Sequence, residues 1–332
     1  MEFSIIIINY KSSQLVIDCI RSVYQQNSTF NFEIIVVDNN SLDGSKEKIT
    51  NLFPSIVWIE MGYNSGFARA NNEGIKAAKG NSILLLNADT VIENNAIERC
   101  FNFFKDSEFV ACGVQLSNVD RTPQISGNYA MKGGLNYLLP LPYLGNLLKS
   151  LSLIIKIKKP NVPDAKGIVE VDWINGAFLM VKKEGILTAG LMDEDFFLYA
   201  EEAEWCSRLK KAGKLCINGD IKVIHLQGET SNEIFRSDGK GYFNLFDKKG
   251  LQIMVSNLVR IRKEFGAGWF LLILSGYLIE IPIFFVGFLI SKIAFSKKYS
   301  FQQVRNYAAN MWIIVKLSPT IIRNHPHFYK FL

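Results

Sequence analysis

Two polar residues, Asn87 and Asp89, directly follow the apolar run at residues 83–86, and their types and spacing could serve metal or phosphate chemistry. On an extended backbone, residues i and i+2 project to the same side, so the amide and the carboxylate can reach one cation together. Asparagine and aspartate also cap helices, and residues 91–105 have a helical pattern, so a helix cap is an equal alternative. The pair therefore needs support from other residues.

Asp38 provides such support, because it follows a second apolar run at residues 33–37. The carboxyl ends of parallel strands meet at one edge of a sheet, so Asp38 and Asp89 are expected to face the same crevice. A carboxylate there can accept the imide N–H of uracil or thymine, although an Asx turn is an equal alternative. Residues 64–72 open a helix with small residues, and Arg69 could pair with a nucleotide phosphate.

The second half of the chain offers three glutamates on a predicted helix, Glu201, Glu202 and Glu204, and a histidine at the end of a predicted strand, His225. Glutamates on a helix more often form a solvated face, and Glu204 with Arg208 has the i,i+4 spacing of an ordinary ion pair. A single histidine that ends a strand is usually structural. From spacing alone, catalysis by these residues is the weaker interpretation.

The pattern of apolar runs predicts the elements that would position these residues. Strands are expected at residues 3–9, 33–37, 56–59, 82–86 and 110–114, and helices at residues 13–26, 43–52, 66–78 and 94–105. Strands that alternate with helices imply right-handed parallel units and half of a doubly wound sheet. The first strand lacks a following Gly-x-Gly-x-x-Gly turn, which argues against a nicotinamide or flavin enzyme.

Residues 117–167 lose clear periodicity and contain five prolines among apolar residues and lysines. We expect a packed surface loop there, with an acceptor-binding or membrane-facing insertion as the alternative. Strands are then expected at residues 169–173, 177–181 and 222–225, and a helix at residues 196–211.

Length and composition restrict the function further. A chain of 332 residues can form one large α/β domain with an appendage, or two modest domains. The net charge of +6 is spread along the chain, which suits a phosphate-bearing substrate or an anionic membrane and argues against nucleic acid. Five cysteines without a CxxC pair indicate reduced thiols, and the first residues lack the pattern of a signal peptide, so a cytoplasmic protein is expected.

The C-terminal region from residue 245 onward is helical and apolar in pattern. Residues 269–290 are as long as a bilayer-spanning helix, but Glu280 and Pro282 interrupt them, and a carboxylate near the bilayer centre costs about 2.5–3.5 kcal/mol. Residues 292–332 contain lysines and arginines but no acid, so a single crossing would export a basic tail. We expect a re-entrant or interfacial helix pair hinged near residues 280–282, then an amphipathic helix at residues 302–317. A helical cap on a soluble core or an oligomer interface, including a homodimer, is the alternative.

Taken together, several segments resemble family 2 glycosyltransferases of the GT-A fold, in particular the rhamnosyltransferase-like branch. The resemblance covers roughly residues 3–231. It rests on Ser4-Ile-Ile-Ile-Ile-Asn-Tyr, Val37-Asp38-Asn39-Asn40-Ser41-x-Asp43-Gly44-Ser45, Asn64-x-Gly66-Phe67-Ala68-x-Ala70-Asn71-Asn72, Leu85-Leu86-Asn87-Ala88-Asp89, Trp173-Ile-Asn-Gly176-Ala177, Gly190-Leu-Met-Asp193-Glu194-x-Phe196-Phe197-Leu-Tyr199-x-Glu201-Glu202-x-Glu204-x-Cys206-x-Arg208 and His225-Leu-Gln-Gly228-Glu-Thr230.

The resemblance implies an α/β fold, a doubly wound mixed sheet with helices on both faces, plus a C-terminal helical membrane-associating region. The expected catalytic domain is 1–244, with a nucleotide-sugar-binding half at 1–115 and an acceptor-binding half at 116–244. Residues 245–332 form the membrane-associating region. The implied reaction is inverting transfer of a sugar from a nucleoside diphosphate, assisted by Mn²⁺ or Mg²⁺.

The resemblance also assigns residues. Glu202 is the implied catalytic base, with Glu201 beside it and Asp193 as a weaker candidate, and Glu stands at 202 and 204 where the family usually has Asp. Asp89 and His225 are the implied metal ligands. The implied nucleotide-sugar-binding residues are Asn9, Asp38, Asn40, Asn64, Gly66, Arg69, Asn71, Asn87 and Asp89, and the implied acceptor-binding residues are Trp173, Gly176, Glu201 and Arg208.

The branch resemblance suggests dTDP-rhamnose as donor, with UDP-sugars as the alternative. The expected acceptor is a polyprenyl-diphosphate-linked saccharide or polysaccharide at the inner face of the cytoplasmic membrane. Two other functions remain open. A nucleotidyltransferase could use a similar crevice, although no basic Gly-rich loop follows the first strand, and a non-catalytic sugar-binding scaffold would explain the Glu-for-Asp changes.

Overall fold

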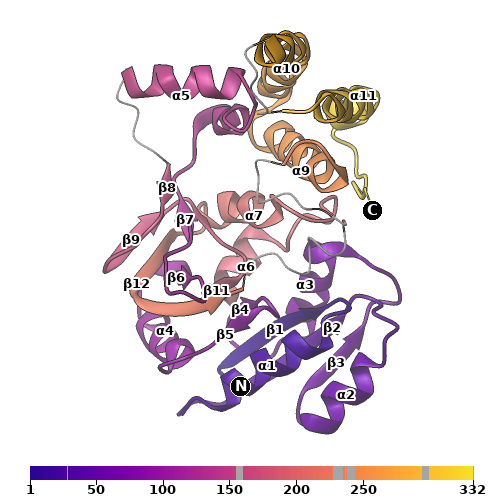
Figure 1. Cartoon of the computed structure of the whole chain (residues 1–332). Coiled ribbons are helices and arrows are strands. Elements are labelled where there is room, and N and C mark those ends of the chain that lie inside the picture. Colours follow the sequence, from indigo (N-terminus) through magenta and orange to yellow (C-terminus); the bar gives the residue numbers. More distant parts are fainter. Residues whose placement is uncertain are drawn as a thin grey trace. The chain divides into compact units, whose positions relative to one another are not determined.

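The computed structural model describes residues 1–27, 29–154, 160–226, 235, 237, 244–293 and 299–331, which belong to two compact units (Figure 1). The first unit comprises Met1–Tyr129, Pro160–Phe197 and Glu201–Gln227. The second comprises Ala130–Lys159, Leu198–Ala200 and Gly228–Leu332.

The first unit begins with alternating strands and helices, as predicted from the apolar runs. These elements are β1 (Phe3–Asn9), α1 (Ser13–Tyr24), β2 (Phe32–Asp38), α2 (Ser45–Leu52), β3 (Val57–Glu60), α3 (Gly66–Ala77) and β4 (Ser82–Leu86). Strands β1, β2, β3 and β4 pair in parallel. Helices connect them because parallel neighbours need a crossover.

The remaining elements of the first unit complete and extend the sheet. They are β5 (Thr90–Val91), α4 (Ala96–Lys105), β6 (Phe109–Ser117), β7 (Gly127–Asn128), β8 (Asn161–Val162), β9 (Ile168–Val171), β10 (Trp173–Ile174), β11 (Phe178–Lys182), α6 (Lys183–Ala189), α7 (Glu201–Leu209) and β12 (Lys214–His225). Among the described residues, nine strands form one sheet in the order β3-β2-β1-β4-β11-β6-β12-β5, with β9 beside β12. Strands β10, β7 and β8 form a small antiparallel sheet.

Strand β11 makes the large sheet mixed, because it runs antiparallel to both β4 and β6. The predicted fold class, a mixed α/β sheet, is therefore confirmed. Successive residues of β1 pack on opposite faces: Ile5 and Ile7 belong to a core with α1 and α4, whereas Ile6 lies against Gly74 of α3. Burial on both faces explains why these strands are continuous apolar runs.

Four features of local structure differ from the sequence-based expectations. Helix α7 begins at Glu201 rather than residue 196, because Tyr199 and Ala200 have positive φ angles, which no right-handed helix contains. Strand β12 begins at Lys214, eight residues before the expected position at 222. Helix α6 was not predicted, and the segment expected as loop at residues 117–167 contains short strands and a helix.

The second unit is helical in its described part. It contains a 3₁₀ segment η1 (Lys132–Leu138) and the helices α5 (Leu144–Ile154), α9 (Lys248–Phe265), α10 (Ala267–Ile293) and α11 (Phe301–Arg323). Helix α10 packs against α5, η1, α9 and α11. Tyrosine hydroxyls connect the helices, since Tyr307 donates to the Tyr277 carbonyl (2.8 Å) and Tyr277 donates to the Tyr137 carbonyl (3.2 Å).

The predicted hinge near residues 280–282 is wrong, because α10 is one continuous helix that contains Pro282. Glu280 is fully buried, and its two carboxylate oxygens accept hydrogen bonds from the backbone N–H groups of Tyr143 and Leu144, each at 2.8 Å. Hydrogen bonds to both oxygens offset much of the desolvation cost of a buried carboxylate. Glu280 thus joins the start of α5 to α10 and does not interrupt the helix.

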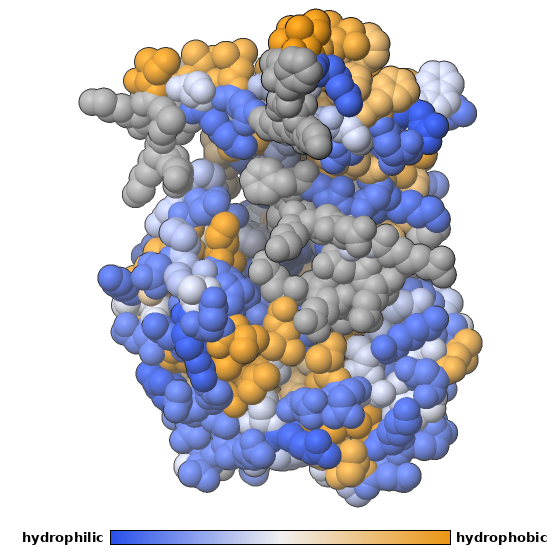
Figure 2. Space-filling view, viewed as in Figure 1, coloured by the Kyte–Doolittle hydropathy of each residue, from blue (hydrophilic) through white to orange (hydrophobic). Residues whose placement is uncertain are grey.

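Helix α10 is the one helix in the described ranges that is long and apolar enough to cross a membrane. Several of its apolar side chains are exposed, and α5 adds Leu147, Leu151 and Ile154 at helical spacing. Figure 2 shows these apolar side chains gathered over α5 and α10. This exposed surface is larger than single scattered apolar residues would give, and it suits association with an apolar phase.

Candidate functional site

Asp38 and Asn9 are neighbours at the carboxyl ends of β2 and β1, where the parallel register pairs them directly. The amide of Asn9 donates to Asp38 Oδ1 (2.7 Å), and Ser41 donates to the same carboxylate through its hydroxyl (2.6 Å to Oδ1) and its backbone N–H (3.0 Å to Oδ2). Asn9 is fully buried and Asp38 is nearly so. Asn9 therefore orients Asp38, which lies at the predicted edge of the sheet.

Asn39, which sequence reasoning did not single out, connects β2 to the start of α3. Its side-chain oxygen accepts hydrogen bonds from the backbone and hydroxyl of Ser65 (3.0 and 2.6 Å), and its amide donates to the Gly66 carbonyl (2.8 Å). The neighbouring Asn40 is partly exposed and has a positive φ angle of 66°. Asparagine tolerates this left-handed backbone better than most residues.

Gly66 lies against the loop that precedes α7. Its φ angle is 78°, and a β-carbon built there would lie 2.1 Å from the Phe197 carbonyl oxygen, so only glycine fits. The next residue, Phe67, donates its backbone N–H to that carbonyl (2.8 Å). Asn64 accepts from the Gly66 N–H at 3.2 Å. The predicted small-residue segment thus allows close approach of a second backbone.

Arg69 and Asn71 also lie on α3. Arg69 Nε donates to the Glu194 carbonyl (2.9 Å) and its Nη1 to the Tyr63 hydroxyl (3.3 Å), while buried Asn71 donates to the Phe67 carbonyl (3.0 Å). The bond from Arg69 to Glu194 holds α3 against the loop around residue 194, whereas the Asn71 bond lies within α3.

Asp89 and His225 lie side by side, as the resemblance implied. Strand β12 pairs with β5 so that His225 is opposite Thr90, and this places the imidazole Nε2 3.4 Å from Asp89 Oδ1. Both side chains are largely buried. The other ring nitrogen, Nδ1, is 2.9 Å from the side-chain oxygen of Gln124.

The Asp89–His225 pair fits a divalent metal ion. Two ligands at about 2.1 Å from one ion, with an angle of about 90–110° between them, are about 3.0–3.4 Å apart, which agrees with the observed separation of 3.4 Å. The residues that the structure describes contain no group of three or more His, Cys, Asp or Glu residues that could hold an ion. The protein would therefore supply two ligands, and a diphosphate could supply others.

Glu202 lies near this edge through Gly176. A β-carbon built on Gly176 would be 3.7 Å from the Cβ of Glu202 and 3.6 Å from the ring of Phe67. The adjacent Ala177 accepts a hydrogen bond from the backbone N–H of Asn87 (3.0 Å), which is two residues before Asp89. Glu202 and the Asn87–Asp89 segment thus both lie close to the two consecutive residues Gly176 and Ala177. Glu201 is buried, whereas Glu202 is partly exposed.

Three further residues of the predicted site are Arg208 and Trp173, expected to bind the acceptor, and Asp193, the weaker candidate for the base. Arg208 forms a bidentate ion pair with Glu204 (both contacts 2.7 Å) and donates to the Ala189 carbonyl (2.5 Å), which holds α6 against α7. Asp193 accepts from the Asp195 backbone at 3.0 Å. Trp173 is partly buried in β10, and its buried indole nitrogen has no hydrogen-bond partner among the described residues. Gly228 and Thr230 of the predicted His225 motif lie outside the described residues.

The order and the mixed directions of the strands in the large sheet match the GT-A fold. Residues 4–161 match the model of glycosyl transferase family 2, and this match supports the assignment of the chain to that family.

Two curated relatives are each 26% identical to this chain over the aligned residues. The low-salt glycan biosynthesis hexosyltransferase Agl10 of Haloferax volcanii is 26% identical over 63% of this chain and 62% of its own length. The dTDP-rhamnosyl transferase RfbF of Shigella flexneri is 26% identical over 61% of this chain and 63% of its own length. The match thus covers somewhat less than two thirds of the length of each of these two relatives.

A solved structure shares the fold across most of the chain. The mannosyltransferase PcManGT from Pyrobaculum calidifontis, solved with GDP-Man and Mn²⁺, superposes with a TM-score of 0.53 at 14% identity. The similarity covers 97% of this chain and 83% of that one.

Proposed function

We propose that this protein is an inverting, metal-assisted hexosyltransferase that moves a sugar from a nucleoside diphosphate to a glycan acceptor. The observation that carries the proposal is the position of Asp89 and His225, 3.4 Å apart, on the sheet edge that also carries Asp38. Family membership supports it.

Asp38 would recognise the base of the nucleotide. A carboxylate has about four acceptor positions, and Asn9 and Ser41 use three of them, which leaves one on Oδ2. One acceptor suits the single imide N–H of uracil or thymine better than the two N–H groups that guanine presents together. Asn40, Asn64, Gly66, Arg69, Asn71 and Asn87 would complete the donor site, with Asn9 orienting Asp38.

Asp89 and His225 would hold the metal ion. A divalent cation there supplies positive charge near the leaving diphosphate. The nitrogen and oxygen ligands favour Mn²⁺ over Mg²⁺, which prefers oxygen alone.

Glu202 would act as the catalytic base. Its carboxylate would remove the proton from an acceptor hydroxyl as that oxygen attacks the anomeric carbon opposite the leaving diphosphate, and this single displacement inverts the configuration. Gly176, which lies beside Glu202 and Phe67, is proposed to contact the acceptor. Glu201, Trp173 and Arg208 are proposed to shape the acceptor side, and Asp193 is the alternative base.

The donor we favour is dTDP-rhamnose, because Asp38 suits a pyrimidine and one relative is a dTDP-rhamnosyl transferase. UDP-sugars are the second candidate, since uracil presents the same imide group. A lipid-linked saccharide or polysaccharide would be the acceptor, as the names of relatives in glycan biosynthesis suggest.

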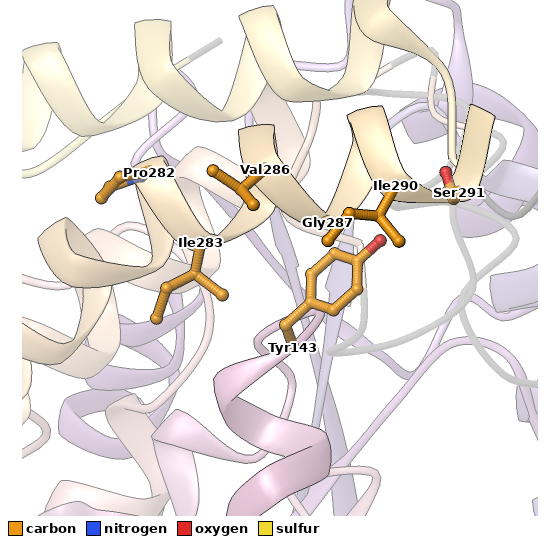
Figure 3. A pocket seen from close by; sticks show the side chains of 7 residues that line it. All are labelled: Tyr143, Pro282, Ile283, Val286, Gly287, Ile290 and Ser291. Carbon is orange, nitrogen blue, oxygen red and sulfur yellow. The ribbon is translucent and has the colours of Figure 1, made fainter. Parts of the chain in front are cut away.

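We also propose that residues 245–332 attach a cytoplasmic catalytic domain, residues 1–244, to the inner face of the membrane. Helix α10 exposes apolar side chains such as Leu289 and Ile290, and no acid occurs after Lys292. An apolar groove of about 630 Å³ is lined by residues of α10 and by Tyr143. Figure 3 shows Tyr143 beside Gly287 in the wall of this groove. Basic residues beside an apolar surface suit anionic lipid.

Vesicle flotation tests the membrane proposal. Leu289→Glu combined with Ile290→Glu should release the protein from anionic vesicles, because two charges would enter the lipid. Leu187→Glu is the matched control, since Leu187 is a highly exposed leucine on α6 of the first unit. Equal flotation of all three proteins would contradict attachment through α10.

A donor panel tests the reaction. Purified protein is mixed with dTDP-rhamnose or UDP-sugars and a membrane extract containing lipid-linked saccharides, with Mn²⁺ or with chelator, and nucleotide release is measured. We expect release of dTDP that requires both metal and acceptor. Release of UDP instead would reject the rhamnose donor, release from no donor would indicate a binding scaffold, and consumption of a nucleoside triphosphate with a sugar phosphate would indicate a nucleotidyltransferase.

A further inference from the structure

Gln124, in the segment after β6, is a buried residue that contacts His225 at two points. Its side-chain nitrogen Nε2 donates to the His225 carbonyl (2.7 Å), and its oxygen Oε1 lies 2.9 Å from the ring nitrogen Nδ1. The same Nε2 donates to Asn118 Oδ1 at 2.7 Å. The backbone of Gln124 is fixed as well, because its N–H donates to the Leu116 carbonyl and its carbonyl accepts from Gln115.

These contacts determine which way the Gln124 amide points. The atom that faces the His225 carbonyl and Asn118 Oδ1 must be the NH₂ group, since both neighbours accept hydrogen bonds. The orientation of Asn118 is itself fixed, because the Thr122 hydroxyl donates its hydrogen to Asp120 Oδ1 (2.5 Å) and therefore accepts from the Asn118 NH₂ group (2.8 Å). The side-chain oxygen of Gln124 therefore faces the imidazole.

The orientation of the amide determines the tautomer of the ring. A carbonyl oxygen can only accept, so Nδ1 of His225 must carry the proton, and in the neutral ring Nε2 then presents a lone pair. That lone pair points toward Asp89 Oδ1 at 3.4 Å. Two acceptors that face each other suit a cation between them, whereas an Nε2–H ring would donate to Asp89 and occupy the same space.

We propose that Gln124 is a positioning residue that holds His225 in its Nδ1–H form, so that Nε2 is available to a divalent metal ion. The tautomer itself is inferred from the hydrogen bonds. Its use in binding a metal ion rests on the proposed function. Partners of the second ring nitrogen commonly fix metal-binding histidines, and their loss typically weakens metal affinity about 10- to 100-fold.

The tautomer can be measured on the metal-free protein. The chain contains three histidines, so labelling them with ¹⁵N gives few imidazole signals, and the variant His325→Gln/His327→Gln isolates that of His225. The nitrogen shifts and their couplings to ring protons show which nitrogen is protonated. We expect Nδ1–H in the otherwise native protein and a shift to Nε2–H in Gln124→Met, which keeps the length but loses the strong acceptor.

Gln115→Met is the matched control. Gln115 is as buried as Gln124 and bonds to nearby backbone groups, but it has no contact with His225 in the described structure. We expect it to lower Tm as Gln124→Met does while His225 stays Nδ1–H. Manganese binding, followed by electron paramagnetic resonance with dTDP present, should weaken about 10- to 100-fold in Gln124→Met alone.

The outcomes separate the two proposals. An Nε2–H or doubly protonated ring in the native protein, or an unchanged tautomer in Gln124→Met, would overturn the role of Gln124 and needs no metal to observe. The first of these measurements requires no substitution at Gln124, so it holds even if that variant does not fold. A tautomer that changes as expected while the native protein binds no Mn²⁺ would support Gln124 as the residue that fixes the ring and reject the proposed metal site.

Discussion

Gly176 and Glu202 are neighbours in the fold: a β-carbon built on Gly176 would lie 3.7 Å from the Glu202 Cβ. The Cβ atom of Glu202 thus lies beside a residue with no side chain. Its carboxylate extends from the first turn of α7. This relationship places the proposed base next to the segment that contains Trp173 and Gly176, the residues proposed to bind the acceptor.

Glu202→Gln should reduce sugar transfer roughly 10²- to 10⁴-fold, because a neutral amide cannot accept the hydroxyl proton. Donor affinity, measured calorimetrically, should stay nearly unchanged. Glu202→Asp should lose roughly 10²-fold, since a shorter side chain displaces the carboxylate by more than 1 Å. Glu184→Gln, on helix α6, is the control: this glutamate is exposed and outside the proposed site, so the change should leave turnover nearly unchanged. Full transfer by Glu202→Gln would exclude Glu202 as the base.

The strands of the first unit were predictable because burial on both faces requires continuous apolar runs, and Ile5, Ile6 and Ile7 of β1 show this directly. The hinge in α10 was predicted wrongly because Glu280 and Pro282 are local signals of interruption. Their effect is overridden by a contact 137 residues away in the chain, the hydrogen bond from Tyr143 to Glu280. No local pattern could show that partner.

Asp38→Asn should weaken binding of dTDP or UDP roughly 10- to 150-fold, because hydrogen bonds to charged groups contribute about 1.5–3 kcal/mol. An amide has one acceptor oxygen, and Asn9 and Ser41 already occupy that position on Oδ1. UDP methylated at N3 lacks the imide N–H and serves as the control. It should bind the native protein weakly and show little further loss with Asp38→Asn; an equal loss for both ligands would reject the imide contact.

The site shows the same limit of prediction as the fold. Asp89 and His225 were paired through the family resemblance, and the register of β5 with β12 accounts for the pairing physically. Gln124 carries no motif and lies 101 residues before His225, so only the folded structure brings them together. Asn39 belongs to the motif at residues 37–45, but its contacts with Ser65 and Gly66 depend on the packing of α3.

Burial raises the pKa of the Cys19 thiol to about 12. Native protein at pH 8 should therefore resist thiol reagents, and all five cysteines should react only after unfolding, since each is a buried thiol outside any disulfide. Above pH 9 the unfolded state loses this proton first, so stability should fall by up to about 1.4 kcal/mol per pH unit until pH 12. Urea unfolding of Cys19→Ala should show a smaller fall over that range, and an identical slope would contradict the raised pKa.

Gly66→Ala should be strongly destabilising, by more than about 1 kcal/mol in urea unfolding, for two reasons that a control can separate. The alanine would adopt φ near 78°, and its methyl group would collide with the Phe197 carbonyl at 2.1 Å. Gly44, before α2, has a similar φ of 72° but no atom within 4 Å of a built β-carbon. Gly44→Ala therefore measures only the cost of placing an alanine in the left-handed backbone conformation, about 1 kcal/mol of unfolding free energy. The excess loss in Gly66→Ala reports the close approach of α3 to residue 197, and equal losses in the two variants would show that the loop moves away at no cost.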